Sequence, residues 1–566
     1  MLSVHFVHFI YNLLLSIFYS QLTTLHSIMI TLLDYGAGNV RSVRNAITRL
    51  GYTVRDVQGP QDILTAEKLI FPGVGSFGSV MQRLHRDGLV EPLIERIRLN
   101  KPFLGICVAL QALFDGSEES PGVAGLSILP GQIKRFTGLN SLNDQAVPLS
   151  VPQIGWNGIV LHKESPILKN YHGQKLYFVH SFRASVADVG PDWLLSTTDY
   201  GDSFVSGVEK GNVTAFQFHP EKSGEAGLNI LKNYLDSQGN EAISVRQSLP
   251  VQDKRTHIAK RIIACLDVRT NDQGDLVVTK GDQYDVRNDG EVRNLGKPVE
   301  LARRYYEEGA DEITFLNITG FRDFPMKDQP MLEVLQRTSE NVFVPLTIGG
   351  GIREFTDSDG KHYSALDVAA EYFRSGADKI SIGSDAVYAV EEFLKTGKRS
   401  GKSAIEQISM VYGAQAVVIS VDPRRVYAHA PEDTAHNTIE TTTPGPHGEN
   451  YCWYQCTVKG GREGRDIDAL QLAKTCELLG AGEILLNCID KDGTNSGFDH
   501  ELIRQVRGAV TIPVIASSGA GSAQHFVDVF QETDVEAALA AGIFHRQEVP
   551  VSEVKEAMRK NGIETR

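Results

Sequence analysis

The chain has 566 residues, of which 42% are hydrophobic and 53 are glycine, and its formal net charge is −14. Domains usually hold about 100–200 residues and barrels about 250, so this length predicts two large domains. The negative net charge argues against nucleic-acid binding as the main activity, because a protein needs a positively charged surface to neutralise the phosphates. A small phosphorylated substrate stays compatible, since backbone N–H groups can bind it locally.

The first 28 residues contain no charged side chain. Residues 6–19 are mostly apolar, but they are fewer than the roughly 20 that a membrane span needs. The basic start of a secretory signal and the arginines of a transit peptide are also missing. We therefore leave residues 1–28 outside the fold. They are either part of a targeting segment or a consequence of the choice between Met1 and Met29 as the start.

The first predicted domain, residues 29–236, alternates strands and helices. A strand at 30–33, a turn and a helix at 40–50 come first, and a strand at 69–71 then enters a glycine-rich loop at 72–78. Such a loop can aim backbone N–H groups at an anion or an oxyanion, although a plain turn has the same pattern. The alternation predicts a parallel sheet with functional loops at its carboxyl edge.

A cysteine follows the next apolar run, 102–106, and the residues after Cys107 can begin a helix. A strand, a sharp turn and a helix expose a side chain at the turn, and the start of a helix favours thiolate over thiol. The alternative is a cysteine buried in the core. The other cysteines are scattered, which argues against a disulfide framework and fits a reducing compartment.

A base and a carboxylate end the apolar run 213–218. His219 and Glu221 are two residues apart, which on a strand places both side chains on one side. The imidazole can take a proton from a thiol, and the carboxylate can fix the tautomer and stabilise the imidazolium. Together with Cys107 they predict a nucleophilic triad.

These two motifs, Gly-Ile-Cys107-Val-Ala-Leu-Gln111 and Phe-His219-Pro-Glu221, resemble the class I glutamine amidotransferases. The resemblance implies that Gly73 belongs to an oxyanion loop and that Gln111 contacts glutamine. Ala109 stands where the family usually has Gly, and it is small enough for the turn to form.

Two further segments, 151–157 and 177–182, resemble the branch of that family that serves imidazole glycerol phosphate synthase. The resemblance implies substrate contacts at Ser181 and Phe182. Gln153 stands where that branch more often has His, outside the triad. The polar stretch 237–256 is interpreted as a linker whose few apolar residues could dock on the surface.

The second predicted domain, residues 257–566, repeats strand and helix eight times, the pattern of a (β/α)₈ barrel. The predicted strands are 261–267, 312–317, 344–351, 379–383, 416–422, 483–490, 511–517 and 537–541. The two halves of this domain resemble each other, which predicts two equivalent anion sites on opposite sides of one face.

Glycines and serines at the strand ends supply those two anion sites. The first cluster is Gly349, Gly350 and Gly351 with Gly383 and Ser384, and the second is Ser517, Ser518 and Gly519 with Ala541 and Gly542. The implied substrate carries a phosphate at each end.

Polar residues between the clusters predict the chemistry. Asp267 and Asp422 end opposed strands and suit general acid–base work, with turn or capping roles as the alternative. Lys280 could hold a phosphate or close a loop, and Asp492 follows the sixth strand.

Four charged residues begin barrel strands, namely Arg261, Glu312, Lys379 and Glu483. Each is followed by about five apolar residues, or roughly 17 Å of strand. They are either solvated charges or a salt-bridged gate where another domain docks.

A long insertion, residues 424–466, exceeds what a barrel loop needs. Within it, 439–443 and 451–458 predict a hairpin that is a candidate lid over the active site.

From about residue 260 onward the chain resembles the cyclase subunit of imidazole glycerol phosphate synthase, and both domains together resemble the fused bifunctional enzyme of histidine biosynthesis in plants and fungi. The resemblance implies that glutamine releases ammonia, which crosses the barrel to a bis-phosphorylated aminoimidazole ribonucleotide. It implies Asp267 and Asp422 as the cyclase acid and base. It also implies an ammonia gate at the four strand-start charges, Arg261, Glu312, Lys379 and Glu483. Asn317 replaces a common Asp and receives no role.

The same resemblance implies no metal or organic cofactor, no nucleic acid, no membrane and no obligate protein partner. Residues 34–44 resemble plant sequences, which implies a plastid, with the cytoplasm as the alternative. Two other functions stay open: an independent γ-glutamyl cysteine hydrolase fused to a phosphate-binding barrel of other specificity, and a non-catalytic scaffold.

Overall fold

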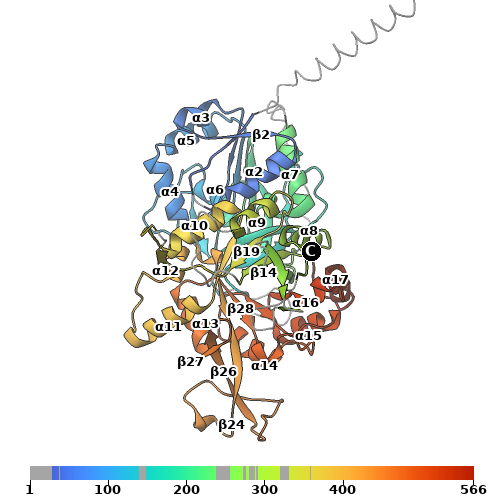
Figure 1. The fold of residues 1–566 in the computed structure, drawn as a ribbon. Coiled ribbons are helices and arrows are strands. Elements are labelled where there is room, and N and C mark those ends of the chain that lie inside the picture. Colours follow the sequence, from blue (N-terminus) through green and yellow to red (C-terminus); the bar gives the residue numbers. More distant parts are fainter. Residues whose placement is uncertain are drawn as a thin grey trace, which may run out of the picture.

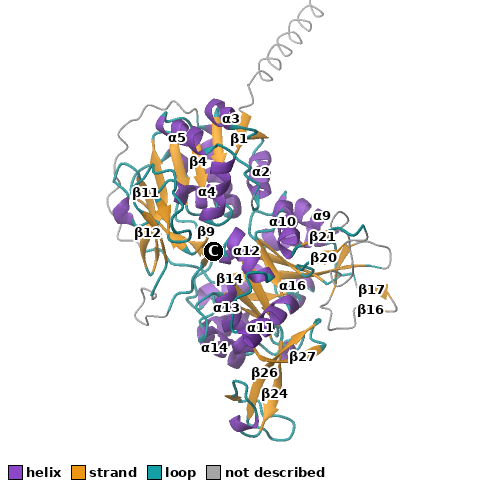
Figure 2. Ribbon diagram, turned by 90° about the vertical axis from the view of Figure 1, so that its left-hand side faces the viewer, coloured by secondary structure: helices purple, strands orange, loops and turns teal. Residues whose placement is uncertain are grey.

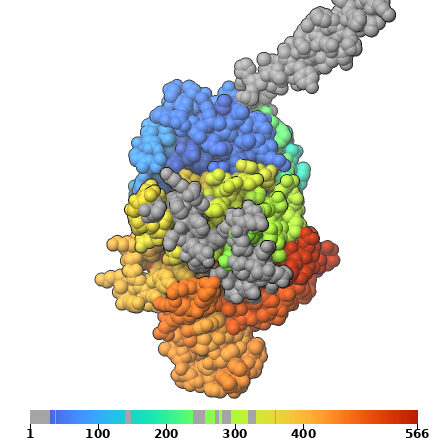
Figure 3. All heavy atoms as spheres, viewed as in Figure 1, coloured from blue at the N-terminus to red at the C-terminus, as the bar shows by residue number. Residues whose placement is uncertain are grey.

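The computed structural model describes residues 29–36, 38–138, 148–237, 255–271, 276–279, 287–288, 291–292, 294–318, 330–356 and 359–566. The expected extension at 1–28 and residues 238–254 of the expected linker lie outside the described residues. The first domain, which runs from blue to the green of α7 (Gly224–Asp236) in Figure 1, sits directly on the second domain, which runs from green to red. The space-filling view shows the same two layers in close contact (Figure 3).

The first domain is built on an eight-stranded sheet with the order β2-β1-β3-β4-β13-β12-β11-β8 (Figure 2). The strands from β2 to β13 are parallel, and β12, β11 and β8 continue the sheet in antiparallel fashion. The predicted parallel or mixed sheet is therefore confirmed. The strands are β1 (Met29–Leu32), β2 (Thr53–Asp56), β3 (Lys68–Phe71), β4 (Phe103–Ile106), β8 (Val160–Leu161), β11 (Leu194–Tyr200), β12 (Asp202–Lys210) and β13 (Val213–Phe216).

In the part of this domain that the structure describes, six helices flank the sheet, and two smaller sheets complete the domain. The helices are α2 (Val40–Arg49), α3 (Pro60–Thr65), α4 (Phe77–Arg86), α5 (Val90–Arg98), α6 (Val108–Ala112) and α7 (Gly224–Asp236). One small sheet joins β5 (Gly116–Ser117), β6 (Gln132–Arg135) and β10 (Phe182–Arg183), and the other pairs β7 (Gln153–Asn157) with β9 (Leu176–His180).

The second domain is a closed barrel of eight parallel strands, as predicted. The ring closes because the first strand pairs with both the second and the last. The strands are β14 (Arg261–Thr270), β18 (Glu312–Asn317), β19 (Leu346–Gly349), β22 (Lys379–Ile382), β23 (Val417–Val421), β28 (Glu483–Asn487), β29 (Val514–Ser517) and β30 (Ala537–Ala540).

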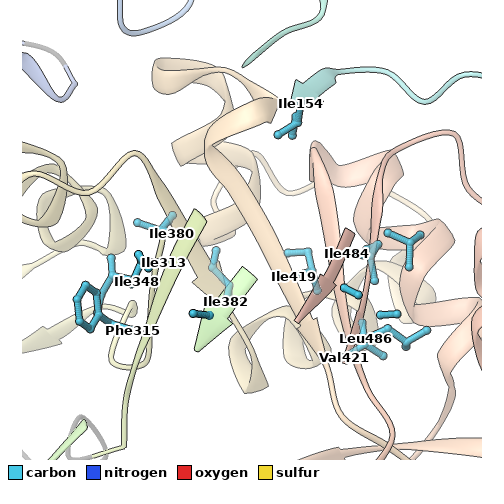
Figure 4. Close-up of a cluster of buried hydrophobic side chains, with 14 of the residues drawn as sticks. Ile154, Ile313, Phe315, Ile348, Ile380, Ile382, Ile419, Val421, Ile484 and Leu486 are labelled. Carbon is cyan, nitrogen blue, oxygen red and sulfur yellow. The ribbon is translucent and has the colours of Figure 1, made fainter. Parts of the chain in front are cut away.

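The residues of the barrel strands alternate between two separate cores, as the period of two in a strand requires. Residues such as Ile313, Ile380 and Ile419 face outward and pack against the helices (Figure 4). Their neighbours in sequence fill the barrel interior, where Ile263, Cys265, Val418, Leu485, Ile515, Ala537 and Leu539 form a second cluster.

The surrounding helices are α8 (Pro298–Glu307), α9 (Pro330–Ser339), α10 (Ala365–Ser375), α11 (Ser384–Thr396), α12 (Ala404–Tyr412), α13 (Ala469–Leu479), α14 (His500–Arg507), α15 (Ala523–Thr533), α16 (Gly542–His545) and α17 (Val551–Lys560). Among the described residues, every helix is too short or too polar to span a bilayer.

The insertion is a four-stranded antiparallel sheet that projects from the barrel, coloured orange in Figure 1. Its strands are β24 (Pro423–Ala428), β25 (Ile439–Glu440), β26 (Tyr451–Val458) and β27 (Glu463–Asp468). The predicted pairing of 439–443 with 451–458 exists only over two residues, Ile439 and Glu440. The main partner of β26 is β24, which pairs with it over six residues.

The amino ends of the barrel strands face the first domain. Trp156 of β7 is fully buried there, and its indole N–H donates to the Asp311 carbonyl at 3.3 Å. The guanidinium of Arg566 covers the same indole ring at 4.3 Å from its centroid. Ile154 of β7 even belongs to the outer core of the barrel (Figure 4). The two domains thus share a packed interface.

Candidate active sites

Cys107 occupies a sharp turn between β4 and α6. The apolar, fully buried strand Phe103–Ile106 leads into it, and its backbone has φ +53° and ψ −107°, which a side-chain-bearing residue rarely adopts. The Cys107 N–H donates to the Phe216 carbonyl at 2.6 Å, which ties the turn to the neighbouring strand. This conformation is the one expected of a nucleophile between a strand and a helix.

The predicted base and carboxylate are in contact, but not for the predicted reason. Strand β13 ends at Phe216, so His219 and Glu221 do not share one side of a strand, and that expectation is wrong. Pro220 instead starts the 3-10 turn η3 (Pro220–Lys222), which curls the carboxylate back toward the ring. His219 Nδ1 and Glu221 Oε1 are 2.8 Å apart, and both residues are buried.

Electrostatics favour the charged form of His219. Burial alone would lower its pKa, but the adjacent Cys107 and Glu221 outweigh burial and hold the pKa of His219 well above its ordinary value. An imidazolium beside the sulfur is the state that a thiolate nucleophile requires.

Two glutamines link the thiol to a neighbouring segment. The Gln217 side chain donates to Cys107 Sγ at 3.4 Å and accepts from the Gln111 amide at 3.1 Å. Gln111 also donates to the Phe182 carbonyl at 3.0 Å, and Ser181 beside it is buried. The residues expected to contact substrate therefore gather near Cys107. Gln217 was missed, although its position two residues before His219 could have suggested it.

The glycine-rich loop lies against the nucleophile turn. A Cβ atom on Gly73 would stand 1.6 Å from the Ile106 carbonyl oxygen and 2.6 Å from the Val108 nitrogen. Only glycine therefore allows the loop to come this close. The loop passes beside Cys107, where an oxyanion of an acyl intermediate would form.

The four strand-start charges form one closed ring of ion pairs at the floor of the barrel. Arg261 contacts Glu312 at 2.9 Å and also pairs with Glu483. Lys379 contacts each carboxylate at 2.6 Å. All four side chains are at most 1% exposed, so the interpretation as solvated charges is wrong.

The ring neighbours of Arg261 and Glu483 favour the charged forms of these two residues. Burial would lower the pKa of Arg261, but Glu483 and Glu312 raise it above its ordinary value. Burial would likewise raise the pKa of Glu483, but Arg261 and Lys379 lower it. On the side of the first domain, burial and the Glu312 carboxylate hold the pKa of Tyr177 well above its ordinary value. Tyr177 therefore lies within the electrostatic reach of the ring.

A cavity of about 690 Å³ opens at the other end of the barrel. It brings together both predicted carboxylates, Asp267 and Asp422, and Asp492 also lines it. The two predicted anion clusters line it as well, through Gly350, Gly351, Gly383, Ser384, Ser517, Ser518 and Gly519. Lys280 lies outside the described residues.

Asp422 is held by two polar neighbours. Asn487 donates to Asp422 Oδ1 at 2.7 Å, and Ser420 donates to the same oxygen at 3.2 Å. Burial raises the pKa of Asp422, and these two hydrogen bonds only partly oppose it. Asn487 was missed, although alternation from Glu483 along β28 places it inside the barrel.

The candidate lid contributes a turn to the cavity wall. Lys459, Gly460 and Gly461 join β26 to β27 and line the cavity, and the Lys459 N–H donates to Ser384 Oγ at 3.0 Å. The base of the insertion therefore touches one anion cluster, while its tip projects away (Figure 1). Among the described residues, no group of three or more His, Cys, Asp or Glu side chains is arranged to hold a metal.

Comparison with known proteins assigns the same two halves. The family model described as glutamine amidotransferase class-I matches residues 31–237, and the one described as histidine biosynthesis protein matches residues 261–550. The Arabidopsis thaliana protein named "Imidazole glycerol phosphate synthase hisHF, chloroplastic" is 59% identical over 95% of this chain and 89% of its own length. The chain belongs to the hisHF family.

Other members and partial relatives agree with this assignment. The Schizosaccharomyces pombe hisHF protein is 54% identical over 93% of this chain and 98% of its own length. The Methanobrevibacter smithii protein named "Imidazole glycerol phosphate synthase subunit HisF" is 40% identical and covers 55% of this chain and 99% of its own length. As a hisHF member, the chain joins a glutamine amidotransferase and a histidine-biosynthesis barrel in one polypeptide.

The closed ring predicts an unusual sensitivity of stability to Lys379. In Lys379→Met, Glu312 and Glu483 stay buried with one cation between them, and an uncompensated buried charge costs about 3–5 kcal/mol of unfolding free energy. Equilibrium unfolding in urea measures the loss.

The matched control is Lys232→Met, which removes the exposed ion pair between Lys232 and Asp236. We expect that change to cost at most about 1 kcal/mol. Equal small losses in both variants would contradict the ring as an interdependent unit.

Proposed function

We propose that this chain is a glutamine-dependent imidazole glycerol phosphate synthase in which the two sites work in sequence. The amidotransferase site releases ammonia from glutamine, and the barrel uses it on a bis-phosphorylated ribulosyl aminoimidazole carboxamide ribonucleotide. The products are imidazole glycerol phosphate and an aminoimidazole carboxamide ribotide. The observation that carries the proposal is the order along the barrel axis: a docked Cys107 domain, a buried charged ring, an apolar interior, and a cavity with Asp267 and Asp422 between two anion clusters.

The first step uses the geometry around Cys107. The thiolate attacks the carboxamide carbon of glutamine, and backbone N–H groups near Gly73 and Val74 receive the developing oxyanion. His219, held as an imidazolium by Glu221, gives its proton to the leaving ammonia. Water then hydrolyses the thioester and releases glutamate.

The second step is passage of ammonia to the far cavity. The charged ring separates the Tyr177 side of the interface from the apolar barrel interior, so ammonia must pass between its members. A neutral molecule crosses the apolar interior more readily than an ion, because an unpaired charge there is costly. We propose the ring of Arg261, Glu312, Lys379 and Glu483 as this gate.

The last step occurs in the 690 Å³ cavity. One phosphate binds at Gly350, Gly351, Gly383 and Ser384, and the other at Ser517, Ser518 and Gly519. The raised pKa of Asp422 favours a carboxyl that can donate a proton, while Asp267 on the opposed strand accepts one. The two carboxyl groups thereby move protons during cleavage and ring closure, and no metal or organic cofactor is needed.

The compartment and partners that we propose for this chain rest on its relatives and on its two fused domains. The Arabidopsis relative is named chloroplastic, which supports a plastid, and the cytoplasm is the alternative. One chain that holds both sites needs no separate protein subunit, and we propose no nucleic-acid or membrane partner.

Cys107→Ala tests the coupling of the two sites. Glutamine-dependent product formation should fall by at least about 10³-fold, because removing a catalytic nucleophile has effects of that order or larger. With ammonium salt the variant should still make product, since the barrel cavity is unchanged. Both rates are measured by product formation, and wild type is the control.

The same experiment decides between the alternatives. Glutamine hydrolysis that ignores the bis-phosphate, or a Cys107→Ala protein that fails with ammonium salt, would favour an independent hydrolase on a barrel of other specificity.

Glu221→Gln should move the pH dependence of glutamine hydrolysis. The carboxylate raises the pKa of His219, so the imidazolium persists to higher pH in wild type. Without that charge His219 loses its proton at lower pH. The alkaline limb of the plot of kcat/KM against pH should therefore move to lower pH. The control is Glu225→Gln, which changes an exposed carboxylate nearby in sequence and should leave the alkaline limb where it is in wild type. If the limb also stays at the wild-type pH in Glu221→Gln, the assigned role of Glu221 is contradicted.

Import into isolated chloroplasts tests the compartment. The full chain, made by translation in vitro, should become protected from added protease if it enters the plastid. A chain that stays fully digestible would favour the cytoplasm.

A further inference from the structure

Arg546 comes directly after the short helix that begins at the second anion cluster. It lies four residues after Gly542, and its N–H donates to the Gly542 carbonyl at 3.0 Å, so both residues lie on one face of the same helical turn. A Cβ atom on Gly542 would stand 2.8 Å from Arg546 Nη1. Because Gly542 has no side chain, the guanidinium can lie against the backbone of the cluster.

Glu548 holds this guanidinium by two of its three nitrogens. Arg546 Nε donates to Glu548 Oε1 at 2.6 Å, and Nη2 donates to Oε2 at 2.7 Å. Such a two-point pair fixes the plane of the guanidinium. Nη1, the nitrogen nearest Gly542, donates to no other group among the described residues. Arg546 therefore presents one oriented, positively charged N–H edge beside the cluster.

Arg546 also lines the 690 Å³ cavity. The lysines and arginines among the described lining residues are Arg353, Lys459 and Arg546. The Arg353 N–H donates to the Gly351 carbonyl at 3.1 Å, and the Lys459 N–H donates to Ser384 Oγ at 3.0 Å, so these two residues stand beside the first cluster. Of the three, Arg546 is the one that stands beside the second cluster.

A phosphate in the second cluster requires such a charge. A phosphate monoester carries about −1.5 to −2 charges at pH 7, and neutral backbone and hydroxyl donors do not neutralise it. The alternative is that Arg546 and Glu548 form an ordinary surface ion pair, since their side chains are 35% and 48% exposed and such pairs contribute little to stability. The position of Nη1 against Gly542 favours a role in binding.

We propose that Arg546 is a substrate-binding residue that donates from Nη1 to the phosphate held at Ser517, Ser518 and Gly519. Glu548 is a positioning residue that holds the guanidinium in the orientation of this contact. The ligand is a phosphate monoester dianion at one end of the bis-phosphorylated substrate. This inference rests on the proposed function, since it takes the second cluster to bind a phosphate.

Arg546→Met tests the inference because it keeps an unbranched side chain and removes the charge and its donors. The assay supplies ammonium salt in place of glutamine, so that the amidotransferase site takes no part. KM for the bis-phosphate substrate should rise by about 10-fold to 100-fold, the range expected for the loss of one hydrogen bond to a charged group. We expect kcat to stay within about threefold of wild type, because Asp267 and Asp422 are unchanged.

Two further variants show whether the guanidinium itself is needed. Arg546→Lys keeps the charge but cannot pair with Glu548 and bind the phosphate at once, so KM should recover only in part. Arg303→Met is the matched control, since it removes the exposed pair between Arg303 and Glu307 on α8, and it should leave KM unchanged. A KM for Arg546→Met equal to that of wild type would overturn the inference.

Product inhibition separates a local loss from a general distortion of the cavity. Each of the two products carries one of the two phosphates of the substrate. In Arg546→Met, inhibition by one product should weaken about as much as KM rises, and inhibition by the other should stay within about twofold of wild type. Equal weakening for both products would also overturn the inference.

The wild-type protein distinguishes the two levels of failure. If it does not convert the bis-phosphate with ammonium salt, the proposed function fails and takes this inference with it. If wild type converts the substrate and Arg546→Met does so with the same KM, only the role of Arg546 is excluded.

Discussion

The buried ring of Arg261, Glu312, Lys379 and Glu483 is the constraint on which the arrangement of this molecule depends. Taking four charges out of water costs several kcal/mol for each ion, and only alternating pairs with good geometry can offset that cost. Here each cation contacts both carboxylates, and all four side chains are at most 1% exposed. The ring lies at the end of the barrel that faces the amidotransferase domain, which is where we place the passage for ammonia.

The first active site is built from strained and closely packed backbone. Cys107 sits at positive φ, and Gly73 approaches so closely that no side chain would fit. Such conformations cost free energy and persist only where the surroundings impose them. Here the surroundings include the barrel, because the loop that carries Gly73 and Val74 continues into a hydrogen bond with α12. The loop beside the thiol is therefore attached to both domains.

Much of the fold and of the two candidate sites could be predicted from the sequence, because the motifs that indicate them are short and local. Alternating strands and helices predicted the barrel, and strand-end glycines, serines and aspartates predicted the cavity that Gly350, Ser517 and Asp422 line. Placement of His219 and Glu221 failed in detail, because a proline-initiated 3-10 turn, not a strand, brings them together. The predicted pairing within the insertion holds over only two residues, and the longer pairing of β26 with β24 on its other edge was not predicted.

Other features could not be predicted because they depend on contacts between distant segments. Nothing near Trp156 in sequence indicates that its indole meets Asp311, 155 residues away. The ion pairs among the four strand-start charges likewise join residues far apart in sequence, so the sequence pattern alone left solvated charges and a gate as alternatives. The domain boundaries at 28, 236 and 256, and the roles of the individual site residues, stay predictions.

The central claim is that ammonia passes inside the molecule from Cys107 to the cavity at Asp267 and Asp422. The most direct test supplies glutamine labelled with ¹⁵N in its amide, the bis-phosphate substrate and a large excess of unlabelled ammonium, and measures ¹⁵N in the imidazole product. We predict that the product keeps nearly the isotopic enrichment of the glutamine amide. Dilution of the label to the ratio in the surrounding solution would contradict internal passage.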